Sequence, residues 1–406
     1  MTSTTRVVVI GSGLAGVRLA RRLGELGTPA LLVGEEEHRP YNRVLLAEVL
    51  AGRYEPDVIS LPALTAPAEL VRARVTGIDR AARTVSCADG SVIGYGTLVL
   101  ATGSNPVLPP LRGLFTPGDA LPEGVHAFRT MDDCLDLSKA VRPSARAVVI
   151  GGGLLGVSAA RALAVRGAQV VLAQQSERLM ERQLDPAASQ LVGRHLADLG
   201  VEVHTRCRVR DVRVVAGAVR SVELADGYAL DADLVVLACG VRPRAGLARA
   251  AGLAVGEGVL VDGELRTSDP HIHAIGDCAQ HDGTVYGLAA PALDQADILA
   301  GLLTGSATTR YTGTRALTRL TLAGLTPFDL AAFGETDPRP GDDVVQLADA
   351  TRGTYRKVVV RDDRLVGGVL VGELGAVGAL ARAWEGAEPL PGEGPLLHLL
   401  THDGGS

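Results

Sequence analysis

Aromatic residues and paired cysteines are both scarce in this sequence. Only 3% of the residues are aromatic, so leucine, valine and alanine must fill the cores of a chain that is 47% hydrophobic. The five cysteines are scattered, without a C-x-x-C motif or a close pair. Their spacing excludes an evident redox dithiol, a thiolate zinc site and a cysteine-ligated iron–sulfur cluster, and we expect no metal site.

Excess positive charge and long apolar runs are lacking as well. The 40 basic and 46 acidic residues give a formal net charge of −6, which argues against a nucleic-acid-binding surface. No run approaches the length of a membrane span, and the first residues lead into a predicted strand without a signal-peptide pattern. We therefore expect a cytoplasmic protein with no membrane contact.

The most informative pattern that is present lies near the N-terminus. An apolar strand over residues 6–10 is followed by Gly11, Gly13 and Gly16, a predicted helix over 17–26, and a second strand that ends at Glu35. The first glycine permits a tight turn, the second lets a pyrophosphate approach the backbone, and the third lets the helix pack closely. Glu35 can accept hydrogen bonds from ribose hydroxyls. A purely structural glycine turn would explain the glycines but not the order of the other elements.

The same pattern returns in the middle of the chain. A strand over residues 147–150 precedes Gly151, Gly153 and Gly156, a helix over 157–167 and a strand over 170–173. Two dinucleotide folds imply two dinucleotides. The acid expected after the second strand is replaced by Gln174, with Arg178 nearby. Because glutamine does not repel a 2′-phosphate as a carboxylate would, both NADH and NADPH stay open.

Three further features accompany these folds. Two predicted strands end in small residues, at 101–103 and 238–240, which leaves room for a ligand at the edge of a parallel sheet. Asp277 ends a short apolar strand, an unusual place for a charge unless a ligand hydroxyl or a helix N-terminus meets it. Arg43 follows Glu35 closely, and it either neutralises a pyrophosphate or begins a solvated helix.

Other distinctive segments extend these motifs along nearly the whole chain. They are Tyr41–Leu46, Phe128–Asp133, Arg182–Asp185, Gly240–Arg244, Thr267–Asp277, Val285–Pro291 and Leu365–Glu373. With them, the chain resembles the two-dinucleotide-fold FAD/NAD(P)H-dependent oxidoreductases. Within that group it is most similar to the N-terminal flavin module of the assimilatory, NADH-dependent nitrite reductase large subunit.

The resemblance implies an α/β fold with two Rossmann-like dinucleotide-binding domains, in a glutathione-reductase-like architecture, and a small C-terminal α+β domain. A chain of 406 residues has room for two or three domains. We expect a discontinuous FAD-binding domain over 1–115 and 243–305, and an NAD(P)H-binding domain over 116–242. The C-terminal domain would cover 306–386, with short strands and a final helix, and residues 387–406 would form a tail.

The resemblance also assigns residues to each cofactor. FAD would be bound by Gly11, Gly13, Leu14, Ala15, Gly16, Glu35, Glu36, Arg43, Ala101, Thr102, Gly103, Gly276, Asp277, Tyr286 and Pro291. NADH or NADPH would be bound by Gly151, Gly153, Leu154, Leu155, Gly156, Gln174, Arg178 and Gly240. No catalytic side chain is expected, because the flavin carries the chemistry.

Three departures from the family pattern shape the functional hypothesis. Ser158 stands where members commonly have a glutamate, and Gln174 replaces the ribose-binding acid. The sequence also stops where the nitrite reductase subunit continues into iron–sulfur and siroheme regions. We expect an oxidoreductase that passes electrons to a separate iron–sulfur, molybdenum or siroheme protein, such as a partner in nitrate or nitrite assimilation. The alternatives are a ferredoxin or rubredoxin reductase, and a nucleotide-binding subunit or redox sensor with little turnover. The oligomeric state stays open.

Overall fold

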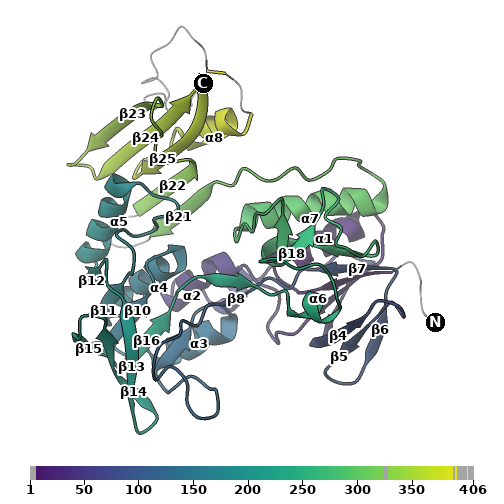
Figure 1. Ribbon diagram of the computed structural model, residues 1–406, viewed down its shortest axis with the longest axis horizontal. Coiled ribbons are helices and arrows are strands. Elements are labelled where there is room, and N and C mark those ends of the chain that lie inside the picture. The colour runs from purple at the N-terminus through teal and green to yellow at the C-terminus, as the bar shows by residue number, and fades with distance from the viewer. Residues whose placement is uncertain (1–5, 323–327, 387–388, 391–399, 401–406) are drawn as a thin grey trace.

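A parallel five-stranded sheet organises the first part of the chain (Figure 1). The computed structural model describes residues 6–322, 328–386, 389–390 and 400. In spatial order the strands of this sheet are β19 (Ile272–Ala274), β7 (Thr97–Leu100), β1 (Val7–Ile10), β2 (Ala30–Gly34) and β3 (Glu69–Arg72). All residues of β1 and β2 are buried, because both faces of the sheet are covered.

The two faces of this sheet have different covers. On one face α1 (Leu14–Glu25) packs against α7 (Ala289–Thr304), and both bury small and branched apolar residues. On the other face lies an antiparallel sheet of β4 (Val75–Asp79), β5 (Thr84–Cys87) and β6 (Val92–Gly94), beside α6 (Gly246–Ala250). The sequence predicts a meander over residues 71–100 that leads into a buried strand starting at Leu98. The structure has the buried strand as β7, but the meander prediction is wrong at its start, because β3 joins the parallel sheet.

A second parallel sheet repeats this design. Its strands, in spatial order, are β12 (Val201–His204), β11 (Gln169–Ala173), β10 (Arg146–Ile150), β16 (Leu234–Leu237) and β9 (Val125–Ala127). The helices packed on it are α3 (Met131–Ala140), α4 (Leu154–Val165) and α5 (Pro186–Asp198). The opposite face carries the antiparallel strands β13 (Val209–Val215), β14 (Ala218–Leu224) and β15 (Ala229–Asp231).

Short elements connect the two parallel sheets. The strands β8 (Ser104–Pro106) and β17 (Val241–Pro243) pair antiparallel where the chain crosses between them. The turn η1 (Arg43–Leu45) and helix α2 (Leu46–Leu50) extend from the first sheet and pack against α3 and α4. The remaining short elements are η2 (Pro56–Ile59), β18 (Val259–Val261), η3 (Gly276–Cys278) and β20 (Ala279–His281).

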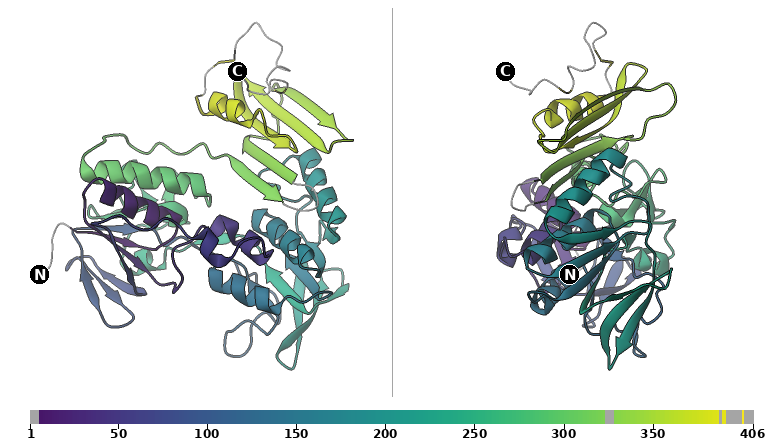
Figure 2. Two further views of the ribbon diagram at one scale, coloured as in Figure 1. Left: turned by 180° about the vertical axis from the view of Figure 1, so that it is seen from behind. Right: turned by 90° about the vertical axis from the view of Figure 1, so that its left-hand side faces the viewer.

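The C-terminal part forms an antiparallel sheet, the third sheet, which packs on the helices of the second parallel sheet (Figure 2). Its strands, in spatial order, are β21 (Thr318–Leu322), β22 (Phe328–Gly334), β25 (Arg364–Val371), β24 (Thr354–Arg361) and β23 (Asp343–Asp349). One face packs on α8 (Val377–Gly386), and the other contacts α5, where the rings of His195 and Phe328 stack at 4.6 Å. The sequence predicts strands here over residues 318–322, 343–346, 355–360 and 365–371, so β22 is not among the expected strands. The expected tail lies almost wholly outside the described residues.

The fold class expected from the sequence is confirmed, with two dinucleotide folds and a small α+β unit. Both glycine-motif helices begin three residues earlier than expected, at Leu14 and Leu154. The motif therefore lies at the helix N-terminus itself. The limits given above for the individual domains stay a prediction.

Two candidate dinucleotide sites

The first glycine turn has two packing positions and one open position. A Cβ at Gly11, whose φ is +113°, would lie 2.1 Å from the carbonyl oxygen of Ala101, and a Cβ at Gly16 would lie 1.9 Å from that of Gly11. At Gly13, in contrast, no described atom lies within 4 Å of an added Cβ. The N-terminus of α1 begins there at Leu14, and no described side chain caps it. Open space beside unpaired N–H groups fits a pyrophosphate.

The acid at the end of β2 is held by an arginine that the sequence analysis does not assign. Arg244 donates two hydrogen bonds to the Glu35 carboxylate, one of them at 3.0 Å. The backbone N–H of Arg244 donates to the carbonyl of Gly103 (2.8 Å), and the hydroxyl of Thr102 donates to the carbonyl of Arg244 (2.7 Å). The hydrogen bonds from Arg244 lower the pKa of Glu35, although partial burial opposes them. Glu35 is therefore ionised at neutral pH and fits as an acceptor for ribose hydroxyls.

Glu36 and Arg43 face each other rather than open space. Glu36 accepts hydrogen bonds from Arg43 and from the hydroxyl of Tyr41 (2.6 Å). Arg43 also donates to the carbonyl of Arg129 (3.1 Å), and the Tyr41 hydroxyl accepts from the N–H of Met131 (2.8 Å). This network joins the segment after β2 to the start of α3. A cofactor role for Glu36 and Arg43 stays a prediction.

A charged cluster around Asp277 contains two further residues that sequence reasoning missed. Arg129 donates to the carboxylate of Asp277 (2.7 Å) and to the hydroxyl of Ser104 (2.6 Å), which itself donates to Asp277 (2.9 Å). The Nε of Arg129 is buried and has no hydrogen-bond partner among the described residues. A buried unpaired donor is costly, so this atom fits a polar group of a bound cofactor. The signal was available, because Arg129 lies in the segment Phe128–Asp133 that carries the resemblance.

Of the remaining predicted FAD residues, Gly276 and Pro291 lie where η3 meets the start of α7, whereas the Tyr286 hydroxyl contacts a different segment. Gly276 has a φ of +73°, and an added Cβ there would lie 3.1 Å from the Cβ of Ala15. Pro291 is buried in the first turn of α7. The Tyr286 hydroxyl accepts a hydrogen bond from the N–H of Thr314 (3.1 Å), which lies in the segment between α7 and β21. Contact of Tyr286 and Pro291 with a flavin ring stays a prediction.

The second glycine turn has the same geometry as the first. A Cβ at Gly151 (φ +109°) would lie 2.4 Å from the carbonyl oxygen of Ala238, and one at Gly156 would lie 1.8 Å from that of Gly151. Gly153 again has no described atom within 4 Å of an added Cβ, and α4 begins at the next residue. Leu154 and Leu155 form the first turn of α4. Gly240, with a φ of +98°, is likewise open in the described structure.

The loop after β11 folds back onto this turn. Gln174 accepts a hydrogen bond from the N–H of Gly152 (2.8 Å) and donates to the carbonyl of Arg178 (3.4 Å). The N–H of Met180 donates to the carbonyl of Gly152 (2.8 Å). Among the described residues, Ser158 hydrogen-bonds within α4, where its hydroxyl donates to the carbonyl of Leu154 (2.8 Å). Gln174 thus contacts both the second glycine turn and the backbone of Arg178. A contact of either residue with a nucleotide ribose stays a prediction.

Two negative observations apply to the part of the chain that the structure describes. There, no three histidine, cysteine, aspartate or glutamate side chains gather where a metal ion could bind. Within the same residues, no helix is both long and apolar enough to cross a membrane.

Comparison with known proteins identifies the family. The family model for pyridine nucleotide-disulphide oxidoreductases matches residues 5–296, and the model for the rubredoxin NAD+ reductase C-terminal domain matches residues 318–385. The chain belongs to the pyridine nucleotide-disulphide oxidoreductase family. Family membership implies FAD and a nicotinamide dinucleotide, and the two open glycine turns fit both.

Individual relatives support this assignment. The chain is 34% identical to the assimilatory nitrate reductase electron transfer subunit of Bacillus subtilis (strain 168), over 91% of this chain and 48% of that protein. It is 30% identical to the probable ferredoxin reductase CtmF of Castellaniella defragrans, over 90% of each. The chain spans about half or less of the length of the first curated relatives it matches.

Solved structures show the same architecture over more than nine-tenths of the chain. Putidaredoxin reductase, in its covalent complex with putidaredoxin, aligns with a TM-score of 0.84 and 26% identity over 97% of this chain and 98% of that chain. The ferredoxin reductase for the CYP199A2 system of Rhodopseudomonas palustris aligns with a TM-score of 0.80 and 29% identity, over 91% of each chain.

Proposed function

We propose that this protein is an FAD-dependent oxidoreductase that takes electrons from NADH or NADPH and passes them to a separate redox protein. The observation that carries the proposal is the pair of glycine turns, each open at its second glycine and each at the N-terminus of a helix. When bound, FAD supplies a ring that accepts hydride from the nicotinamide and releases electrons onward.

The chain's own residues bind and orient the two dinucleotides. The N–H groups at the start of α1 and α4 hold the pyrophosphates, and Glu35 holds a ribose while Arg244 fixes its carboxylate. Arg244 also hydrogen-bonds Thr102 and Gly103 at the end of β7. Since Arg244 directly follows the crossover strand β17, it connects the first site to the strand pair between the two units.

The five cysteines support a separate acceptor. All five are free thiols, and Cys87, Cys134 and Cys278 are buried. Burial raises the pKa of Cys134 to about 12 and that of Cys239 to about 11, so these thiols are protonated at neutral pH. With no dithiol to relay electrons among the described residues, the electrons leave for a partner protein directly from the flavin.

Two classes of acceptor are supported by different observations. The likeness to an electron transfer subunit of assimilatory nitrate reductase favours an iron–sulfur, molybdenum or siroheme partner in nitrate or nitrite assimilation. The match of residues 318–385 to a rubredoxin reductase C-terminal domain favours rubredoxin or ferredoxin instead. A cytoplasmic location belongs to the same proposal.

An acceptor panel separates these classes. FAD-loaded protein is mixed anaerobically with NADH or NADPH and then with rubredoxin, a ferredoxin, or the assimilatory nitrate or nitrite reductase. We expect reduction of one of these proteins at a rate set by its concentration. If the nucleotide reduces the flavin but none of these redox proteins reoxidises it, the proposal of a separate acceptor protein is refuted.

A matched pair of glycine variants tests the second site. Gly153→Ala places a methyl group in the open space of the turn and is expected to weaken reduction by NAD(P)H at least tenfold, while FAD stays bound. Gly193→Ala, in the middle of α5, also points into space without described atoms and is the control. Equal rates for both variants would place the nucleotide elsewhere.

A further inference from the structure

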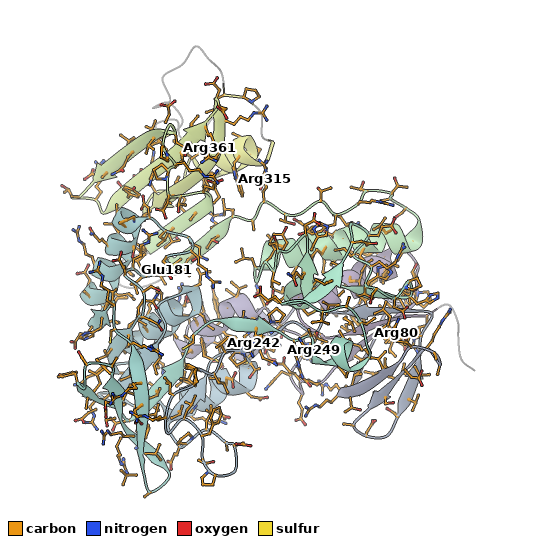
Figure 3. The ribbon with its side chains drawn as sticks, in the orientation of Figure 1. Arg80, Glu181, Arg242, Arg249, Arg315 and Arg361 are labelled. Atoms are coloured by element: carbon orange, nitrogen blue, oxygen red, sulfur yellow. The ribbon has the colours of Figure 1, made fainter. Side chains whose placement is uncertain are left out.

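Residues 174–185, between β11 and α5, form what we call the nucleotide loop. This loop is in contact with the third domain, which is the C-terminal unit of β21–β25 and α8. A guanidinium nitrogen of Arg178 lies 2.8 Å from a carboxylate oxygen of Asp337, in the loop between β22 and β23. Figure 3 shows the two regions together: the labelled Glu181 lies on the nucleotide loop, beneath the third sheet that carries Arg361. Acids nearer in sequence are engaged elsewhere, since Glu177 pairs with Arg206 and Glu181 accepts from Ser176. The charge partner of Arg178 therefore comes from another domain.

Both loops are held in place at a buried ion pair. Lys357 donates to Asp185 (2.9 Å), the N-cap residue of α5 at the end of the nucleotide loop. The same ammonium group donates to the carbonyl of Thr336 (2.8 Å), directly before Asp337. The position of Asp337 next to Arg178 is thus fixed by groups that do not depend on the exposed pair itself.

We propose that Asp337 supplies the carboxylate that disfavours NADPH, in place of the acid that is missing at Gln174, so that NADH is preferred. This inference rests on the proposed nicotinamide nucleotide site. An arginine beside the ribose would otherwise attract the 2′-phosphate of NADPH. With Asp337 bound to it, the guanidinium is already neutralised, and a 2′-phosphate that approaches Arg178 also approaches a like charge.

The expected size of the discrimination is moderate. The Arg178 side chain is 27% exposed and that of Asp337 is 59% exposed, so water and salt screen the repulsion. At a high effective dielectric, the repulsion between a doubly charged 2′-phosphate and one carboxylate a few ångströms away lowers the affinity for the phosphorylated nucleotide about five- to tenfold.

Binding of two adenine nucleotides tests the inference without flavin chemistry. The dissociation constants of ADP and 2′,5′-ADP are measured by calorimetry on the FAD-loaded protein. Asp337→Asn is expected to tighten 2′,5′-ADP about five- to tenfold, to leave ADP unchanged, and to lose part of the gain at high salt. In Asp337→Asn/Arg178→Gln the gain should disappear. Asp343→Asn, at an exposed acid that begins β23, is the control.

The outcomes separate this inference from the proposed function. An unchanged ratio of the two constants in Asp337→Asn, an equal change in both, or no binding of ADP to the wild type would overturn it. If ADP binds and the ratio shifts, but NADH does not reduce the flavin, the discrimination stands and the reductase proposal fails. The ratio of kcat/KM for NADPH and NADH should move in parallel where turnover occurs.

Discussion

Replacing Lys357 by methionine tests how the third domain is fixed to the nucleotide domain. The Lys357 and Asp185 side chains are 8% and 3% exposed, and their charged atoms lie 2.9 Å apart. Asp185 also accepts hydrogen bonds from the hydroxyl of Tyr355 (2.5 Å) and from the N–H of Ala188 (3.0 Å). The substitution keeps most of the side-chain volume and removes only the charge and its hydrogen bonds.

The expected cost follows from what remains. Breaking a buried ion pair on one side costs about 3–5 kcal/mol, because it leaves an uncompensated charge. Asp185 keeps its two other hydrogen-bond donors, Tyr355 and Ala188. We therefore expect the free energy of unfolding to fall by about 3 kcal/mol, at the lower end of this range. Adding Asp185→Asn should recover part of this loss, since asparagine still caps a helix and carries no charge. The double variant is therefore expected to be more stable than Lys357→Met alone.

The chain offers both a probe and a control. Its single tryptophan, Trp384, is 8% exposed and packs against Phe333 in the third domain, so urea unfolding followed by tryptophan fluorescence reports on this domain. The only other lysine, Lys139, forms an exposed pair with Asp136 at 3.0 Å. Lys139→Met is expected to change stability by less than about 0.5 kcal/mol. A cost below about 1 kcal/mol for Lys357→Met would refute the reasoning.

The same pair gives a pH dependence. Burial raises the pKa of Asp185, but hydrogen bonds from Tyr355, Ala188 and Lys357 outweigh it and hold the pKa below its ordinary value of 3.8. Because the folded pKa is depressed, this stability is fully present above the unfolded pKa and is lost as the pH falls through the folded one, below about pH 4. In Lys357→Met the acid transition should begin at a higher pH, and an unchanged acid midpoint would count against the account.

Three further predictions concern the sites. Gly13→Ala should fold, with an unchanged circular dichroism spectrum, and lose FAD. Gly11→Ala should be insoluble, because its Cβ would meet the Ala101 carbonyl oxygen. A Gly11→Ala protein that is soluble but free of FAD would contradict this prediction. Arg129→Met should weaken FAD binding at least tenfold, measured by flavin release on dilution, because a donor in the Asp277 cluster is lost. Iodoacetamide at pH 7.5 should leave reduction of an artificial acceptor unchanged, because Cys87, Cys134 and Cys278 are buried and partial burial raises the pKa of Cys207 and Cys239. Loss of activity would show a reactive cysteine.

Local patterns were enough to predict the parts of the fold that repeat along the chain. The two glycine motifs lie between apolar strands. In each motif the first and third glycines avoid a clash with backbone atoms, and the second leaves open space at the helix N-terminus. The strand β22 was missed, although Phe328–Gly334 is apolar enough to form one. The sequence pattern does not assign β3 to the parallel sheet, because its four residues are all exposed and give no sign of the sheet that they join.

Contacts between distant segments could not be predicted from the sequence. Arg244 is 209 residues from Glu35, Arg129 is 148 residues from Asp277, and Arg178 is 159 residues from Asp337. Each pair consists of ordinary surface residue types, and only the packing of the domains brings them together. The residue types were visible, but their partners depend on tertiary structure.

An anaerobic titration of the FAD-loaded protein with NADH and, separately, NADPH tests the central claim most directly. The flavin absorbance is followed as each nucleotide is added, and dithionite is added last to reduce any remaining flavin. The account predicts that the flavin is bleached rapidly, and more readily by NADH than by NADPH. Flavin that dithionite reduces but neither nucleotide does would contradict the account and favour a sensor or a nucleotide-binding subunit.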